Sequence, residues 1–266
     1  MKQDFVEVNG YRVRFLEDGF SKSNHVLFLH GLGASAERWG RVVPIFAKYF
    51  HVVAPDIIGF GYSDKPEVNY TISFFLDFVM GFVSALGMEH LNLIGSSLGG
   101  HIAAELAITS KNRIEKLVLV TPAGIMKEST PVLNHYIAAA MYPTFDNAKK
   151  AFEQMAGNPN AVDIVYAKDF VNRMQLPNAK YTFMSAIMGS KAAPNLSGRL
   201  KWIEAPTLIL WGEKDGMIPV RYAGNFQSKI KGSQLAIIKG SGHTPYFEKP
   251  EAFSDTVLEF LRKSKK

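Results

Sequence analysis

The sequence has 266 residues, of which 47% are hydrophobic and 20% are charged. These values are close to those of globular proteins and predict one α/β domain with an insertion and a sizeable buried core. No window contains the roughly 18 to 20 uninterrupted apolar residues that a membrane-spanning helix needs, and the N-terminal residues lack the apolar stretch of a secretory signal. We therefore expect no integral membrane segment and a cytoplasmic location.

The absence of cysteine excludes disulfides, thiolate catalysis and cysteine-ligated metals. The net charge of +6 raises the question of a nucleic-acid partner. The charge is scattered, and its only tight cluster is a C-terminal group without accompanying aromatic residues, which consists of Arg262, Lys263, Lys265 and Lys266. We expect this group to be a solvated tail and predict no nucleic-acid partner.

Apolar runs and turn signals predict alternating strands and helices. Asn9-Gly10 separates two β-rich runs and is typical of a hairpin, here the antiparallel edge of a sheet. Further strands are expected at residues 25–30, 51–55, 91–94, 116–120, 206–211 and 234–238. Helices are expected at residues 35–48, 72–86, 98–109, 219–230 and 250–262. This alternation predicts an α/β fold with a mostly parallel sheet flanked by helices.

The alternation breaks between residues 123 and 199, where helical material contains no run typical of a core strand. We expect residues 1–122 and 200–266 to form the core domain and residues 123–199 to form an inserted helical cap, or lid. Methionines and aromatic residues recur in this cap, namely Met126, Met141, Met155, Met174, Met184, Met188, Tyr136, Tyr142, Phe145, Phe152, Tyr166, Phe170 and Phe183. Any single one of them is at least as well explained by packing between helices as by lining a cavity. Together they are consistent with an apolar lining.

The sharpest local signal is Gly95-Ser96-Ser97-Leu98-Gly99, the only G-x-S-x-G in the chain, placed between an expected strand and an expected helix. At such a strand-to-helix elbow the serine Oγ is presented above the sheet, and small residues on both sides let the backbone approach closely. The helix that begins at Leu98 directs its free N–H groups toward the same place, which favours an oxyanion. Ser97 is therefore the predicted nucleophile, and the Leu98 N–H is a predicted oxyanion donor.

Serine needs a base, and the chain contains seven histidines. Six of them have ordinary structural explanations at strand ends, on helices or in the cap. His243 lies in Gly240-Ser241-Gly242-His243, a glycine-bearing loop after the last expected strand, from which a side chain can reach the carboxyl edge of the sheet. His243 is therefore the predicted base.

These motifs resemble the α/β-hydrolase superfamily along nearly the whole chain. The resemblance is carried by residues 30–33 (HGLG), 56–64 (DIIGFGYSD), 95–100 (GSSLGG), Trp211 and Gly242-His243. It implies the α/β-hydrolase fold and a chain order of nucleophile, acid and histidine. Asp56, Gly59, Gly61 and Ser63 correspond to what looks like the family's structural loop and are expected to form turns.

The resemblance also implies the remaining site residues. Asp215 follows the strand that ends near Trp211 and is the expected acid, which would orient the His243 imidazole. Glu213 is the competing carboxylate and is expected to be a solvated turn residue. The second oxyanion donor is expected at the end of the early strand, from the N–H of Leu32 or alternatively of Gly33.

At residues 95–100 (GSSLGG), 120–124 (VTPAG) and 243–245 (HTP) the chain resembles lidded carboxylesterases and monoacylglycerol-lipase-like serine hydrolases. The resemblance implies hydrolysis of carboxylic esters with an apolar acyl group, with a small-molecule substrate and neither a metal nor an organic cofactor. A monomer or a homodimer is expected. Haloalkane dehalogenases and epoxide hydrolases have aspartate at the elbow, whereas position 97 is serine.

Carbon–carbon hydrolases of aromatic ring-cleavage pathways are the main alternative, because they share the same three catalytic residue types. They commonly have asparagine before the nucleophile and tryptophan after the histidine, whereas this chain has Ser96 and Thr244. Cofactor-free perhydrolases also use these residues. A ligand-binding receptor on the same fold is a different class of hypothesis, which an intact serine, histidine and aspartate argue against.

Overall fold

The computed structural model describes residues 1–20 and 24–263. Lys265 and Lys266 of the predicted basic tail lie outside the described residues. Within these ranges no helix is long and apolar enough to cross a bilayer.

One mostly parallel sheet forms the centre of the molecule, and the described residues contribute eight strands to it in the order β1-β2-β4-β3-β5-β6-β7-β8. The strands are β1 (Lys2–Val8), β2 (Tyr11–Asp18), β3 (His25–Leu29), β4 (His51–Pro55), β5 (Leu91–Ser96), β6 (Ile114–Val120), β7 (Thr207–Gly212) and β8 (Gln234–Ile238). β1 and β2 pair antiparallel, as do β2 and β4, and the other pairs are parallel. Asn9 (φ 52°) and Gly10 (φ 81°) form the left-handed turn that their sequence predicts.

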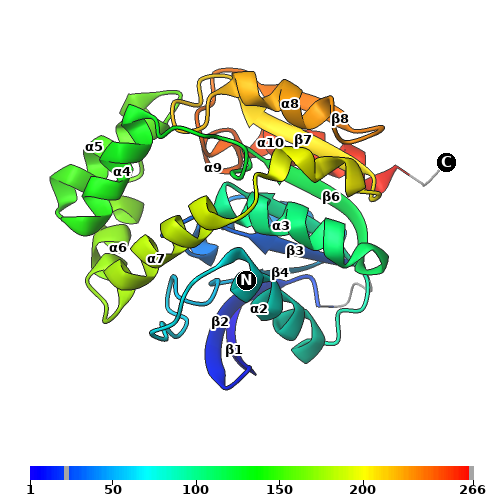
Figure 1. Cartoon of the computed structure of the whole chain (residues 1–266), viewed down its shortest axis with the longest axis horizontal. Helices are drawn as coiled ribbons and strands as arrows, with labels where there is room; N and C mark the ends of the chain where they lie inside the picture. Colours follow the sequence, from blue (N-terminus) through cyan, green and yellow to red (C-terminus); the bar gives the residue numbers. More distant parts are fainter. Residues whose placement is uncertain (21–23, 264–266) are drawn as a thin grey trace.

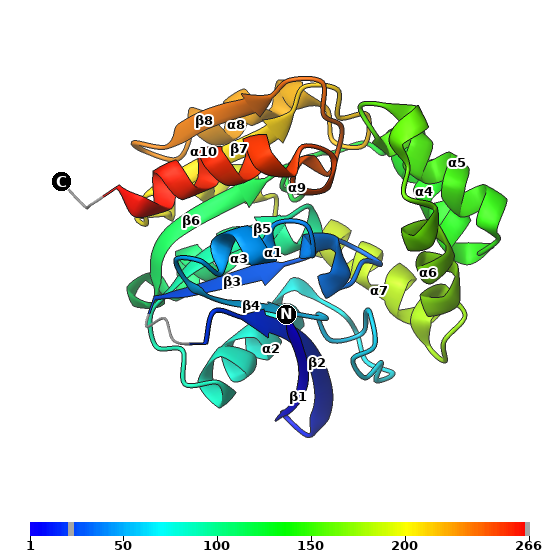
Figure 2. The same cartoon turned by 180° about the vertical axis from the view of Figure 1, so that it is seen from behind.

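Helices cover both faces of this sheet (Figures 1 and 2). α2 (Ile72–Ala85), α3 (Leu98–Thr109) and α8 (Ala223–Gln227) lie on one face. α1 (Val43–Phe46) and α10 (Pro250–Arg262) lie on the other, near the short α9 (Pro245–Glu248). The fold is therefore the predicted α/β-hydrolase arrangement of a sheet between two helical layers.

Alternation along the strands separates two hydrophobic cores. In β3, Val26 and Phe28 belong to the cluster under α1 and α10, whereas Leu27 and Leu29 belong to the cluster under α2 and α3. Successive side chains of a strand point to opposite faces, so a strand covered by helices on both sides is apolar throughout. This explains why the central strands are continuous hydrophobic runs in the sequence.

Two expected helices are much shorter than predicted. Residues 35–48 contain only a 3₁₀ turn (Ala36–Trp39) and α1, because Pro44 cannot continue a preceding helix and instead begins a new one. Residues 219–230 contain a 3₁₀ turn (Val220–Tyr222) followed by α8 alone. The short helix α9 was not predicted.

The insertion between β6 and β7 is helical and consists of α4 (Pro131–Met141), α5 (Phe145–Met155), α6 (Ile164–Met174) and α7 (Ala179–Ala192). These helices gather at one end of the sheet, as Figure 1 shows in green. We call them the cap; the boundaries at residues 122/123 and 199/200 remain a prediction. Parallel strands end at a common edge, and the cap covers the loops that leave this edge.

Candidate active site

Ser97 occupies a strained elbow between β5 and α3. Its φ of 55° and ψ of −116° are unusual for a residue with a side chain. The flanking glycines are sterically required: a Cβ on Gly95 would lie 2.2 Å from the carbonyl oxygen of Gly99, and a Cβ on Gly99 would lie 2.3 Å from the carbonyl oxygen of Leu29. The sequence motif therefore marks a backbone arrangement that brings Ser97 to the edge of the sheet.

Asp215 and His243 form a buried hydrogen-bonded pair. His243 Nδ1 lies 2.8 Å from Asp215 Oδ2, and the two residues are 3% and 5% exposed respectively. Asp215 Oδ1 accepts the backbone N–H groups of Met217 at 2.8 Å and Ile218 at 2.9 Å, which holds the carboxylate in one orientation. With Nδ1 donating to Asp215, His243 Nε2 keeps the lone pair that a general base needs.

The competing carboxylate has a different partner. Glu213 Oε2 accepts the backbone N–H of Gly240 at 2.9 Å on the exposed side of the loop. Glu213 thus supports the turn that carries His243, while Asp215 contacts the imidazole itself.

Ser97 and His243 line one small cavity of about 50 Å³. Among the described residues no hydrogen bond joins Ser97 Oγ to His243. Such contacts are often long in a structure without substrate and shorten when one binds. Three predicted residues, Ser97, His243 and Asp215, are therefore brought to one place from loops after three different strands.

The two residues that carry the predicted oxyanion donors, Leu32 and Leu98, line the large cavity together with Ser97. The Leu98 N–H opens α3, and Gly31 lies so close to the elbow that a Cβ on it would be 3.1 Å from Ser97 Cβ. The Gly31 carbonyl accepts a hydrogen bond from His30 Nδ1 at 2.8 Å. Because C=O and N–H point in opposite directions across a trans peptide, the Leu32 N–H points away from His30. Leu32 remains the predicted second donor, with Gly33 as the alternative.

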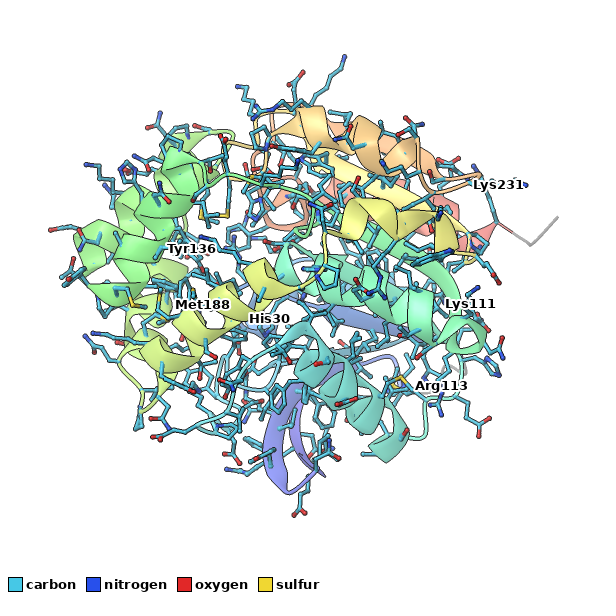
Figure 3. The ribbon with its side chains drawn as sticks, viewed as in Figure 1. His30, Lys111, Arg113, Tyr136, Met188 and Lys231 are labelled. Carbon is cyan, nitrogen blue, oxygen red and sulfur yellow. The ribbon has the colours of Figure 1, made fainter. Side chains whose placement is uncertain are left out.

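His30 is a neutral support for this loop. The N–H of Ile57 donates to its Nε2 at 2.9 Å, so Nδ1 carries the proton that is donated to Gly31. Complete burial lowers the pKa of His30 to about 4, which keeps the ring uncharged at neutral pH. His30 is labelled near the centre of Figure 3, away from the surface.

A second, larger cavity of about 450 Å³ opens on the other side of Ser97. Its lining is mainly apolar and includes Leu98, Met126, Leu133, Ile137, Ile187 and Met217. The two cavities share Leu32, Ser97, Leu133 and Met217, so they meet at the predicted nucleophile.

The predicted cap lining divides into three groups. Met126 lines the large cavity, and Tyr136, Phe152, Met155 and Tyr166 line the small one. Phe170, Met174 and Phe183 are buried between helices. Tyr142 and Met188 are 73% and 63% exposed, and Figure 3 shows Met188 on the cap.

Sequence reasoning missed Arg38 and Tyr246, which also line the small cavity. Arg38 is only 7% exposed and lies in the 3₁₀ turn within the segment expected to be a helix at residues 35–48. Arg38 stands between Glu37 and Trp39 in a segment that also contains Arg41, and this context does not distinguish a buried arginine from an exposed one.

No cluster of three histidine, aspartate or glutamate side chains with the geometry of a metal site occurs in residues 1–20 and 24–263. The predicted turn loop does form around Asp56, whose carboxylate accepts the N–H groups of Ala36 at 2.7 Å and Tyr62 at 2.8 Å. Gly59 and Gly61 have the positive φ angles that this loop requires.

Known proteins similar to this chain include a dienoic acid hydrolase, a meta-cleavage product hydrolase and a phospholipase. The 2-hydroxy-6-oxo-6-(2'-aminophenyl)hexa-2,4-dienoic acid hydrolase of Metapseudomonas resinovorans is 28% identical over 97% of this chain and 90% of its own length. A solved meta-cleavage product hydrolase from Pseudomonas fluorescens IP01 superposes with a TM-score of 0.88 at 24% identity over 97% of both chains, a likeness of fold alone. A bacterial membrane phospholipase A is 27% identical, with a TM-score of 0.88 over 98% of this chain and 85% of its own.

The named hydrolases differ from the nearest relatives expected from the motifs, which were lidded esterases. Both groups nevertheless share one fold family. The family model described as alpha/beta hydrolase fold matches residues 24–173 and 166–250. This chain therefore belongs to the alpha/beta hydrolase fold family.

Proposed function

We propose that this chain is a serine hydrolase that cleaves the carbon–carbon bond beside a ketone in a small carboxylate-bearing substrate, through an acyl-enzyme on Ser97. The relative from Metapseudomonas resinovorans is named for a substrate that carries both a 6-oxo group and a dienoic acid. The same two features, an acyl carbonyl and a carboxylate, match two parts of this site.

The first part is the acyl-transfer machinery. Ser97 Oγ adds to the ketone carbon while His243 takes its proton, and the N–H groups of Leu32 and Leu98 hold the oxyanion. The carbon–carbon bond then breaks, and its electron pair passes to the conjugated leaving fragment, which is protonated by His243. Water, deprotonated by His243, releases the acyl half as a carboxylic acid. Asp215 keeps the imidazole oriented, and these steps need no metal or organic cofactor.

The second part is Arg38, which is the observation that carries the proposal. Its guanidinium lines the small cavity with Ser97 and His243, over the ring of Tyr166 at 4.1 Å and that of Phe247 at 4.3 Å. No carboxylate among the described residues forms an ion pair with it: Asp163 and Glu248 line an adjoining small cavity with Arg38, but Asp163 pairs with Arg41 and Glu248 accepts backbone N–H groups.

Two other buried arginines, unlike Arg38, each form an ion pair. Arg14 and Arg173 are 6% and 2% exposed. Arg14 pairs with Asp56 at 3.0 Å, and Arg173 pairs with Asp169 at 2.8 Å. A buried charge without a counter-charge is costly, so an arginine kept this way beside a nucleophile fits a carboxylate supplied by the substrate.

Ester hydrolysis is the second candidate. Ser96 and Thr244 replace the asparagine and tryptophan common in carbon–carbon hydrolases, and the similar phospholipase acts on ester bonds by its name. The large apolar cavity would accept an acyl chain of either substrate class.

The test compares two substrate panels with the purified protein and with Ser97→Ala. One panel contains 2-hydroxy-6-oxohexa-2,4-dienoic acids with different 6-substituents, and their turnover is measured as the loss of dienolate absorbance. The other contains p-nitrophenyl esters from acetate to palmitate. The proposal expects serine-dependent turnover of the acids with a kcat/KM well above that of the esters. Fast hydrolysis of neutral esters without turnover of the acids would contradict the proposed carbon–carbon cleavage and support ester hydrolysis instead.

Arg38→Met provides the sharper comparison. Charge-assisted hydrogen bonds contribute about 1.5–3 kcal/mol, so kcat/KM for the acid should fall roughly 10- to 100-fold, mainly through KM. The 1-carboxamide analogue, which lacks the charge, should be affected much less. Arg41→Met is the matched control, because Arg41 is exposed and donates to the Phe247 carbonyl outside the cavity. Equal losses for the acid and the amide would contradict carboxylate binding by Arg38.

A further inference from the structure

Two cap side chains donate hydrogen bonds to consecutive carbonyls of the loop that carries the proposed oxyanion donor. The Tyr136 hydroxyl on α4 donates to the Leu32 carbonyl oxygen at 2.7 Å. Arg173 Nη1 on α6 donates to the Gly33 carbonyl oxygen at 2.8 Å. In Figure 3, Tyr136 lies on the cap and His30 lies in the core across from it.

These contacts set peptide orientations. The plane of a trans peptide fixes the direction of N–H once that of C=O is fixed. Three successive carbonyls are held in this loop: Gly31 by His30 from the core, and Leu32 and Gly33 by the cap. Two of the four residues in the 30–33 segment are glycines, and Gly33 has a φ of 65°, so the segment has little conformational preference of its own.

The cap fits closely against the same position. A Cβ on Gly33 would lie 2.7 Å from Phe183 Cε2 and 3.1 Å from the Tyr136 hydroxyl. Helices α4, α6 and α7 therefore each place one side chain on Gly33 or its preceding carbonyl. The loop cannot shift toward the cap without displacing one of these side chains.

Both donors are themselves held in place. Tyr136 and Arg173 are 5% and 2% exposed. Arg173 Nε donates to Asp169 Oδ2 at 2.8 Å, and the other oxygen of Asp169 accepts the Tyr62 hydroxyl at 2.6 Å. Burial raises the pKa of Tyr136, so its hydroxyl remains a proton donor.

We infer that Tyr136 and Arg173 are positioning residues that fix the two peptides after Leu32 and so hold the loop that carries the Leu32 N–H in place beside Ser97. The cap thereby supports the oxyanion hole as well as forming part of the substrate cavity. This inference rests on the proposed role of Ser97 but does not depend on which bond is cleaved. Tyr136 also lines the small cavity, so the test has to separate an effect on the loop from an effect on substrate binding.

The test measures the rate at which a fluorophosphonate labels Ser97. In this reaction Ser97 Oγ forms a bond to phosphorus, fluoride leaves, the proton goes to His243, and the phosphoryl oxygen needs the oxyanion donors. Because one whole oxyanion donor is worth on the order of 100- to 1000-fold, loosening the loop that carries it should slow labelling by roughly 10- to 100-fold in Tyr136→Phe and in Arg173→Met.

Tyr181→Phe is the matched control. Tyr181 on α7 also donates its hydroxyl from the cap to a core carbonyl, that of Val68 at 3.1 Å, but away from both cavities. Its labelling rate should equal that of the wild type. Arg173→Lys retains a donor and should recover part of the rate lost in Arg173→Met.

A second measurement separates positioning from general damage. With any ester or ketone substrate that is turned over, kcat should fall while KM changes little, and affinity for a boronic acid should fall in proportion to kcat/KM across the variants. If the wild type is labelled and the folded variants Tyr136→Phe and Arg173→Met are labelled at the same rate as the wild type, the inference is overturned. Failure of the wild type to label at Ser97 would instead overturn the proposed function.

Discussion

The backbone N–H of His243 donates to the carbonyl oxygen of Met155 at 2.9 Å. Met155 is the last residue of α5, so the loop that carries the proposed base is bonded directly to the cap. The contact depends on two glycines, since a Cβ on Gly157 would lie 2.7 Å from the Gly242 nitrogen. The cap therefore contacts both the histidine loop and the oxyanion loop.

Glu248 completes this connection and gives the first prediction. Its Oε2 accepts the N–H groups of Gly157 at 2.7 Å and Gly242 at 2.9 Å, and its Oε1 accepts the Thr244 N–H at 3.1 Å. Glu248→Ala leaves these donors without their acceptor, which should cost about 1–3 kcal/mol of unfolding free energy and lower kcat. Urea denaturation and steady-state kinetics measure the two effects.

The control for Glu248 is Glu259→Ala, because Glu259 is exposed and its ion pair among the described residues is with the nearby, exposed Lys263. This variant should leave both stability and kcat unchanged. If Glu248→Ala matched it in both measurements, the bridge between cap and histidine loop would have no energetic role.

Replacing the nucleophile tests the centre of the proposal. Ser97→Ala should lower kcat on the order of 10⁴- to 10⁶-fold while the melting temperature stays close to that of the wild type, because the elbow backbone is unchanged. Thermal denaturation beside a turnover assay checks both. Near-normal activity in the folded variant would exclude an acyl-enzyme on Ser97.

The carboxylate that orients the base has its own prediction. In Asp215→Asn the amide can keep its contacts with the backbone but no longer favours the tautomer with the proton on Nδ1 of His243. We expect kcat to fall on the order of 10⁴-fold with little change in KM. A matched Glu213→Gln should retain most activity, and the opposite ranking of these variants would mean that the acid has been misassigned.

Two buried histidines predict how stability depends on pH. Burial is the main cause that lowers the pKa of both His30 and His101 to about 4, from an ordinary value of 6.5. The unfolded chain therefore binds protons more readily than the folded one between these values, and unfolding free energy falls as the pH drops through this window. Each group contributes up to about 3 kcal/mol, and no further change from them is expected above pH 6.5.

Urea denaturation of the wild type and of His101→Gln between about pH 7 and pH 4 measures this effect. The variant should lose less stability on acidification than the wild type does. Parallel pH profiles would mean that His101 does not take up a proton on unfolding in this range.

The local features of this protein were predictable from its sequence. The Asn9-Gly10 turn, helices α3 and α10 and the Ser97 elbow all depend on residues adjacent in the chain, whose backbone preferences act without distant partners. The apolar runs predicted the sheet because a strand covered on both faces must be hydrophobic throughout. The choice of Asp215 over Glu213 followed from the chain order that the resemblance implied.

Only the tertiary structure decided which partners these residues meet. Tyr136 is 104 positions from Leu32, and Arg173 is 140 positions from Gly33, so no sequence period relates them. Arg38 has the sequence context of any charged residue of a surface segment, and its burial beside Ser97 without an ion pair among the described residues depends on how the cap packs against the core. Such contacts depend on how two layers pack, and that packing is set by the shapes of many side chains together and not by any local pattern.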